Sequence, residues 1–292
     1  MTRQIKNIIA ITAFLICIGL INFAGQNIDI QIRGINAFTF ILIVAVLLQI
    51  IFFIPSFLLK TEKYYDLVGS LTYVTTVSLA YFAVENKTMI DSIIYFYVMV
   101  WALRLGIYLF RRVRNDGKDV RFEKAKRHFF WFLQYWMGQA LWVSLTACAA
   151  IIAILSPEDD TLPVLAIFGM ALWLSGFTIE SISDYQKRAF RKENNPSESF
   201  IHTGLWARSR HPNYFGEVTL WTGIAVIALN TLTGIEYITL ISPVFVYILL
   251  TRMSGVNLLE RIADERYGHL EEYQQYKRNT PVLVPKLSKD KI

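Results

Sequence analysis

The feature that most constrains the fold of this 292-residue chain is a series of long apolar blocks separated by charged loops. A helix needs about 20 predominantly apolar residues to cross roughly 30 Å of hydrocarbon. Because 54% of the residues are hydrophobic and only 18% are charged, the chain is too apolar for an ordinary soluble domain. We therefore expect an all-α, polytopic membrane protein with seven to eight transmembrane helices. The eight blocks cover about residues 7–24, 37–59, 67–84, 89–110, 129–155, 162–183, 214–229 and 235–253.

Two of these blocks leave alternatives open. The seventh is the shortest, and only the segment from Asn230 to Gly234 joins it to the eighth, so the pair forms either two crossings or a re-entrant or tilted hairpin. The first block follows Arg3 and Lys6, as in a signal peptide, but Phe23-Ala24-Gly25 is a poor small-x-small cleavage site. We expect the first helix to be retained.

The basic residues predict the orientation of the chain in the membrane. Lys and Arg accumulate in short loops on the cytoplasmic side. With the N-terminus placed inside, 26 of the 29 Lys and Arg fall in cytoplasmic segments, whereas the opposite loops hold only Arg33 and Lys87. The acidic loop Glu158-Asp159-Asp160 falls outside. Both termini are therefore expected in the cytoplasm, and the net charge of +6 is explained by topology and anionic lipids, with no nucleic acid as a partner.

Several ionisable residues lie within the apolar blocks, where each is a default hypothesis for a functional site. Arg104 lies inside the fourth block, although its long side chain is also able to snorkel to the interface. Asp66 begins the third block and is either a helix cap or a functional acid. Glu180 and Asp184 lie one helical turn apart at the cytoplasmic end of the sixth block, and Arg188 continues the same face.

The most unusual segment runs from Gly204 to Glu217. It reads as a turn, a short basic connector and a helix that begins near Pro212, where the missing N–H is harmless. Arg210 and His211 then lie at the positive end of this helix, which suits a phosphate or a carboxylate. The alternative is that both residues only cap and anchor the helix. The spacing of the four histidines supports no metal site, and Cys17 and Cys148 lie within spans, so no disulfide framework is indicated.

These motifs together resemble the C-terminal membrane domain of the steroid 5α-reductase superfamily. The resemblance covers about residues 170–285 and depends on Asp184-Tyr185 with the arginines that follow, on the Gly-Leu-Trp turn, and on Asn213-Tyr214-Phe215-Gly216-Glu217. Isoprenylcysteine carboxyl methyltransferases share part of the pattern, including a tail like Tyr273-x-x-Tyr276 with Thr280-Pro281.

The resemblance implies an NADPH-dependent reductase of a conjugated C=C bond in a lipophilic, 3-oxo-steroid-like substrate. It implies one membrane domain, residues 1–292, in which residues 1–155 are the substrate-side helices and residues 156–292 bind the cofactor. It also implies that an acid and an aromatic residue of earlier spans polarise the substrate ketone, and Asp66 with Tyr97 or Trp101 are the candidates. The candidate cofactor residues are Arg104, Glu180, Asp184, Arg188, Arg191, Arg210, His211, Asn213, Tyr214 and Glu217.

Two other classes of function remain open at this point. The first is a membrane methyltransferase that uses S-adenosylmethionine, and the second is a non-catalytic lipid-binding or transport protein. The clustering of charges at one membrane face disfavours a transporter. Membrane lipids and a lipophilic small molecule are the expected partners. A bacterial inner membrane, with the active site facing the cytoplasm, is the expected location.

Overall fold

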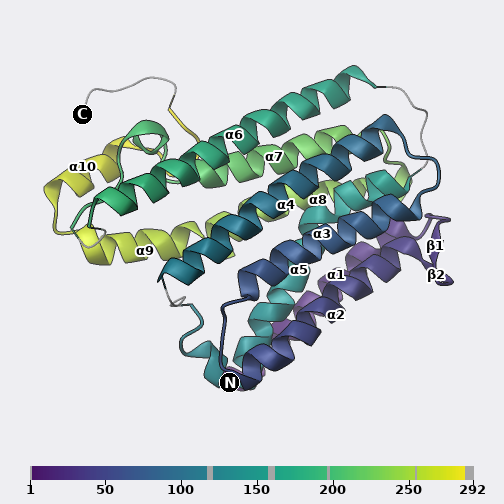
Figure 1. Ribbon diagram of the computed structural model, residues 1–292, viewed down its shortest axis with the longest axis horizontal. Helices are drawn as coiled ribbons and strands as arrows, with labels where there is room; N and C mark the ends of the chain where they lie inside the picture. Colours follow the sequence, from purple (N-terminus) through teal and green to yellow (C-terminus); the bar gives the residue numbers. More distant parts are fainter. Residues whose placement is uncertain (1, 117–120, 157–161, 196–197, 254, 287–292) are drawn as a thin grey trace. The chain divides into compact units, whose positions relative to one another are not determined.

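The computed structural model describes residues 2–116, 121–156, 162–195, 198–253 and 255–286, and in these ranges the chain is almost entirely helical (Figure 1). The main helices are α1 (Arg3–Ile21), α2 (Ala37–Leu58), α3 (Tyr65–Ala83), α4 (Met89–Asp116), α5 (Phe129–Leu155), α6 (Val164–Glu193), α7 (Pro212–Ala228), α8 (Ile241–Ile248), α9 (Val256–Tyr267) and α10 (Glu271–Asn279). A small hairpin pairs β1 (Gln31–Ile32) with β2 (Ile35–Asn36). The all-α fold class is confirmed.

Six segments of the described chain are long and apolar enough to cross a membrane. The expected blocks 67–84 and 214–229 fall on α3 and α7, which are helices but are not among the six. α7 has only 17 residues, and α3 carries several hydroxyl side chains, such as Thr72, which donates to the Val68 carbonyl. Seven to eight crossings were expected, and six segments of the described chain qualify by length and composition. They are Arg3–Gly25, Ala37–Leu58, Met89–Arg111, Phe129–Leu155, Val164–Glu193 and Gly234–Tyr267.

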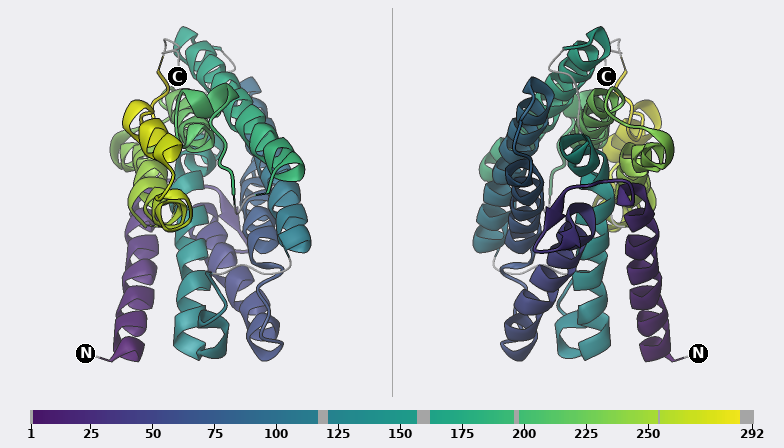
Figure 2. Two further views of the ribbon diagram at one scale, coloured as in Figure 1. Left: turned by 90° about the vertical axis from the view of Figure 1, so that its left-hand side faces the viewer. Right: turned by 90° about the vertical axis from the view of Figure 1, so that its right-hand side faces the viewer.

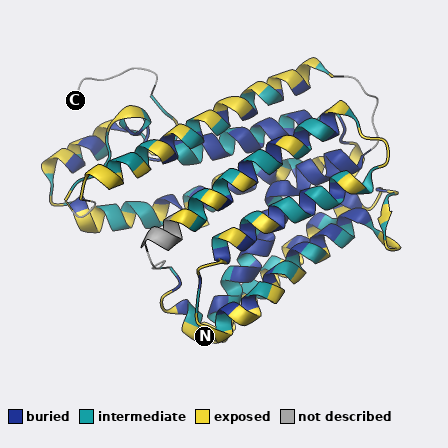
Figure 3. Ribbon diagram, in the orientation of Figure 1, coloured by how far each residue is buried: buried dark blue, intermediate teal, exposed yellow. Residues whose placement is uncertain are grey.

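The chain divides into two compact units, of which the first comprises Met1–Ile167 and Ala225–Ser242. α5 is its central helix and contacts α1, α2, α3 and α4. Figure 2 shows α1, α2 and α5 running side by side. Every residue of α5 from Ala147 to Leu155 is buried, while the outer faces of the surrounding helices are exposed, as the yellow patches on α4 illustrate in Figure 3. The acidic loop Glu158-Asp159-Asp160 lies outside the described residues.

The second unit comprises Phe168–Ile224 and Pro243–Ile292. Its two long helices, α6 and α7, pack closely because glycines lie at their contact. A β-carbon added to Gly216 would lie 2.6 Å from the Glu180 nitrogen, and one added to Gly176 would lie 2.6 Å from the Gly216 oxygen. The close approach repeats seven residues further along α7, where a β-carbon added to Gly223 would lie 2.6 Å from the Gly169 oxygen. Small residues that let helix backbones touch are typical of membrane packing. This contact brings the polar end of α6 against the first turn of α7.

Candidate functional site

The segment between α6 and α7 is held on both sides by hydrogen bonds to buried aromatic residues. Gly204 has φ +63°, and it opens a single helical turn, Gly204–Ala207, that buries Trp206. The Trp206 indole donates to the Ser183 carbonyl on α6 at 3.1 Å, and the Tyr276 hydroxyl of α10 donates to the Trp206 carbonyl at 2.8 Å. Burial raises the pKa of Tyr276, which keeps this hydroxyl protonated. The turn therefore delivers the residues that follow it to a fixed position.

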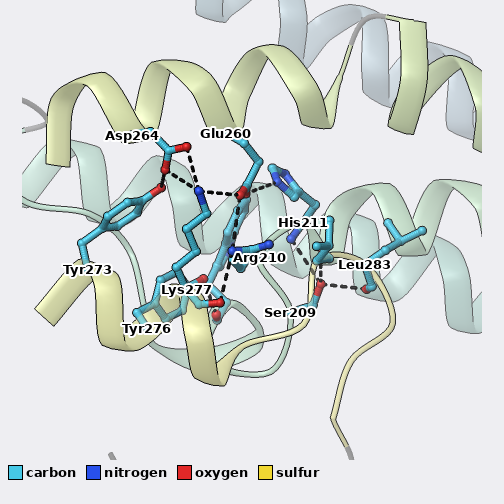
Figure 4. Close-up of polar contacts among 11 residues, drawn as sticks. Ser209, Arg210, His211, Glu260, Asp264, Tyr273, Tyr276, Lys277 and Leu283 are labelled. Atoms are coloured by element: carbon cyan, nitrogen blue, oxygen red, sulfur yellow. Dashed lines mark hydrogen bonds and ion pairs between the residues drawn. The ribbon is translucent and has the colours of Figure 1, made fainter. Parts of the chain in front are cut away.

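The chain after α10 returns along the same segment and binds its backbone. The Arg210 N–H donates to the Pro281 carbonyl at 2.9 Å, and the Lys286 N–H donates to the Arg208 carbonyl at 2.9 Å. Between them the buried Ser209 hydroxyl donates to the Leu283 carbonyl at 2.7 Å (Figure 4). Arg210 and His211 are thus anchored through their own backbone before their side chains make any contact.

Glu260 of α9 is the centre of a charged cluster that holds these two side chains (Figure 4). One carboxylate oxygen lies 3.3 Å from the Arg210 guanidinium, and the other lies 2.9 Å from His211 Nε2. Lys277 of α10 lies 3.8 Å from Glu260 and also bonds Asp264 at 2.5 Å, while Tyr273 donates to Asp264 at 3.1 Å. α9 and α10 therefore position Arg210 and His211 by charge.

His211 is buried, and its ring is stacked on Tyr214 with centroids 5.6 Å apart. Burial lowers the pKa of His211, and the hydrogen bond to Glu260 opposes this shift without cancelling it. The ring is therefore neutral near pH 7. A carboxylate only accepts hydrogen bonds, so the ring proton is on Nε2, facing Glu260. Nδ1 is then an acceptor, and it has no hydrogen-bond partner among the described residues.

A groove lies beside this cluster and encloses about 860 Å³, a volume that includes open solvent. Arg210 and His211 line it, and Glu260 is the one carboxylate among the described lining residues. Lys187 also packs on the Trp206 ring, with its nitrogen 4.7 Å from the centroid. The remaining charged and aromatic lining residues are Arg191, Arg266, Phe190, Phe200, Tyr267, Tyr273 and Tyr276. The groove is thus basic, with aromatic walls, and this composition suits an anionic ligand.

Of the ten candidate cofactor residues, Arg191, Arg210 and His211 line this groove. Tyr214 contacts His211 from α7. Asp184, Glu180 and Glu217 are buried, and Asn213 Nδ2 donates to Asp184 at 3.4 Å, so these four lie where α6 meets α7. Arg188 is exposed and lies 6.0 Å from the Tyr185 ring. Arg104 belongs to the first unit, on α4.

The first unit contains a small cavity among α3, α4 and α5. Asp66 and Trp101 both line it, whereas Tyr97 is buried but is not among its lining residues. The Asp66 carboxylate lies 3.7 Å from Arg121, so it has a cationic neighbour as well as its place in the first turn of α3. The structure therefore brings Asp66 together with Trp101, the second of the two aromatic alternatives. The other lining residues are Gly69, Ser70, Tyr73, Ala102, Leu105, Leu109 and Trp142.

Sequence reasoning missed Glu260 and Lys277, which organise the groove, and Gln139 and Trp142, which lie at or beside the cavity. Glu260 is 49 residues from His211 in the chain, so no local spacing reveals the pair. Gln139 had a visible signal, because it is a carboxamide in the middle of the apolar block 129–155.

Residues 52–280 match the family described as "Protein of unknown function (DUF1295)", and the chain belongs to this family. The chain is also 30% identical over 117 residues to 3-oxo-5-alpha-steroid 4-dehydrogenase 1 of Mus musculus. It is 30% identical over 117 residues to the protein of the same name in Rattus norvegicus, and 24% identical over 119 residues to that of Homo sapiens. These matches cover 40% or 41% of this chain and 40% of each relative.

No solved structure matches the chain. The resemblance to steroid 5α-reductases that the motifs indicated is confirmed by the family and by these relatives. Together with the apolar helices it makes this a membrane protein related to steroid reductases.

Proposed function

We propose that the protein is an NADPH-dependent reductase that acts on the conjugated C=C bond of a lipophilic, 3-oxo-steroid-like substrate. The observation that carries the proposal is the basic groove of the second unit, whose described lining residues include four cations and a single carboxylate, Glu260. The four cations are Lys187, Arg191, Arg210 and Arg266. A dinucleotide phosphate carries several negative charges, whereas the charges of S-adenosylmethionine nearly cancel. The relatives named as 3-oxo-5-alpha-steroid 4-dehydrogenases support the same reaction class.

The groove residues fit NADPH in charge and in hydrogen-bonding groups. The planar guanidinium groups of Arg191 and Arg210 suit phosphate oxygens, which they bind in pairs. His211 adds a buried acceptor, Nδ1, that suits a ribose hydroxyl or an amide N–H of the cofactor. Asn213 and Glu217, at the start of α7, are proposed to hold the carboxamide and ribose. The cofactor supplies the hydride that adds to the β-carbon of the enone.

The carbonyl end of the substrate is assigned to the cavity of the first unit, which is too small to hold a whole steroid. A hydrogen bond to the ketone stabilises the enolate that develops as the hydride adds, and this is the kind of interaction that accelerates such a step. Asp66 lines the cavity and is proposed to act on the ketone, with Trp101 as its aromatic neighbour. The alternative for Asp66 is a structural cap of α3 that pairs with Arg121.

Titration of the purified, detergent-solubilised protein tests the cofactor assignment. A ligand of the native state raises the melting temperature by mass action. We expect NADPH to stabilise more than NADH, added salt to weaken the effect, and Arg191→Ala or Arg210→Ala to lower affinity by about 1–3 kcal/mol. Stabilisation by S-adenosylmethionine with no response to NADPH would refute the reductase proposal and favour a methyltransferase.

A further inference from the structure

Gln139 of α5 is a buried amide that nothing in the described chain satisfies. Its side chain belongs to a residue that is 1% exposed, and neither its Nε2 nor its Oε1 has a hydrogen-bond partner among the described residues. Leaving a buried polar group without a partner costs about 1–3 kcal/mol. Since most buried polar groups in proteins are bonded, this one points to a role other than packing.

The amide lies beside the cavity that contains Asp66. A β-carbon added to Gly69 would lie 2.5 Å from Gln139 Nε2, so the missing side chain of Gly69 is what gives the amide its place against α3. Gly69 itself lines the cavity. Trp142, almost one helical turn after Gln139, also lines the cavity, and its buried indole N–H has no partner among the described residues. Neighbouring positions of α5 thus place one unused donor, of Trp142, at the cavity wall and another, of Gln139, behind Gly69 of that wall.

Two other polar residues of the cavity wall, Ser70 and Asp66, are engaged. The Ser70 hydroxyl donates to the Ala102 carbonyl at 2.6 Å, and Asp66 has Arg121 as its ionic neighbour. Tyr73 packs edge-on against Trp101, with centroids 5.1 Å apart, and against Trp142 at 6.1 Å, which makes this part of the wall aromatic. The cavity has room for about one water-sized group at most. A carbonyl oxygen is such a group, and it accepts two hydrogen bonds.

We propose that Gln139 is a substrate-binding residue, whose amide N–H acts with the Trp142 indole N–H to hold the carbonyl oxygen of the substrate. This inference rests on the proposed function for the identity of the substrate as a lipophilic ketone. Two neutral donors aimed at one oxygen stabilise the negative charge that develops there during reduction, and they need no proton transfer to do so. The role that the sequence assigned to Asp66 with Tyr97 or Trp101 is thereby assigned in part to α5.

The test compares Gln139→Leu with a matched control, Gln49→Leu. Gln49 is a buried amide of α2 that donates to Thr72 at 2.8 Å and does not line the cavity. Each variant is measured for melting temperature, for NADPH affinity and for reduction of a 3-oxo-4-ene steroid. Binding of that steroid is compared with binding of its 3-deoxy analogue in the absence of cofactor.

For Gln139→Leu we expect a melting temperature at or above that of the wild type, unchanged NADPH affinity, and turnover lower by roughly 10²-fold. The preference for the ketone over the deoxy analogue should fall by about 10-fold in affinity, as for one lost hydrogen bond. Gln49→Leu should lower the melting temperature and keep the preference. If Gln139→Leu does not fold, Gln139→Met, with a side chain of similar length, gives the same comparison.

The outcomes separate this inference from the proposed function. If the wild-type protein does not reduce the C=C bond of the 3-oxo-4-ene steroid with NADPH, but prefers the ketone to its deoxy analogue and loses this preference in Gln139→Leu, the reductase would be refuted and the carbonyl site kept. Normal turnover and an unchanged ketone preference in Gln139→Leu would overturn the assignment of Gln139. A wild-type protein with no preference for the ketone would overturn it as well.

Discussion

Replacing Glu260 with Gln separates two effects of this carboxylate on a basic groove. The change removes the charge that lies 3.3 Å from Arg210, 2.9 Å from His211 and 3.8 Å from Lys277, while nearly keeping the shape of the side chain. If charge alone mattered, the groove would become more positive and would bind an anionic cofactor more tightly. If Glu260 mainly positions Arg210 and His211, binding would weaken instead.

The magnitudes favour positioning. Glu260 is 18% exposed and Arg210 11%, so their ion pair is largely shielded from water. Losing a charge-assisted hydrogen bond in such a place costs about 1.5–3 kcal/mol. Removing a nearby like charge from the path of the cofactor gains about 1 kcal/mol or less at a site open to solvent and salt. The balance is a loss of about 0.5–2 kcal/mol, which corresponds to an NADPH Kd roughly 2- to 30-fold higher.

Glu265→Gln is the matched control for this prediction. It makes the same chemical change on the same helix, where Glu265 is 72% exposed and lies 3.9 Å from Arg261 as a surface pair four residues apart. Such pairs contribute about 0.3–0.5 kcal/mol, so its NADPH affinity should match the wild type. The assay is the quenching of protein fluorescence by NADPH, together with denaturant unfolding of each variant. Tighter NADPH binding by Glu260→Gln would refute the positioning argument.

Four further predictions follow from the same contacts. Asp66→Asn should lower turnover by roughly 10²- to 10³-fold with NADPH affinity nearly unchanged, and a normal rate in a reductase assay would return Asp66 to a structural cap. Gly216→Ala should lower the free energy of unfolding by about 1–3 kcal/mol, because its β-carbon would meet backbone atoms of α6 at 2.6 Å, and unchanged stability in denaturant would contradict this packing. Because the folded pKa of His211 lies below its ordinary value, the unfolded chain binds more protons there, so stability should fall as pH drops below about 6.5. Between about pH 7.5 and about pH 5.5, the free energy of unfolding should decrease less in His211→Gln than in the wild type. An equal decrease in both proteins would show that His211 is not the source of this pH dependence. For topology, reporter fusions are made after Lys6, Lys118, Asp159 and Lys289, and only the Asp159 fusion should be external. An external reporter in the loop 111–128 would rule out the eight-span arrangement.

The helices were predictable from the sequence because apolarity and length are local properties. The expected block 129–155 coincides with α5, and the expected block 37–59 differs from α2 by one residue. The expected blocks on α3 and α7 were harder to interpret as crossings. In α3 the polar side chains bond to neighbouring helices, as Ser70 does to Ala102, so a helix buried among others has less need of an apolar surface. Hydropathy alone does not distinguish such a helix from a span.

The candidate site was predictable only as far as its residues share one segment. Arg210 and His211 lie next to each other at the start of α7, and Arg191 lies on the helix before it, so their common groove follows from the order of the elements. The charged residues of α9 and α10 read as a solvated helix surface, and this reading conceals the pairing of Glu260 with His211. Contacts between residues far apart in the chain depend on how helices pack, which the charge pattern of one helix does not encode.

A carboxylate in the wall of a groove that is proposed to bind an anion needs a physical reason, and the positions of the cations supply one. Lys187 is held against Trp206, and Arg210 is held by Glu260 and by the Lys277 carbonyl at 3.2 Å. An arginine that is fixed before the ligand arrives loses little side-chain entropy on binding, which offsets the repulsion from the carboxylate. Arg191 is exposed and also lines the groove, where its charge raises the association rate and the salt dependence of binding in addition to its proposed contact with phosphate. The cations of the groove therefore differ in role. Arg210, which Glu260 holds in place, fixes the position of the ligand, whereas the exposed Arg191 attracts the ligand by its charge.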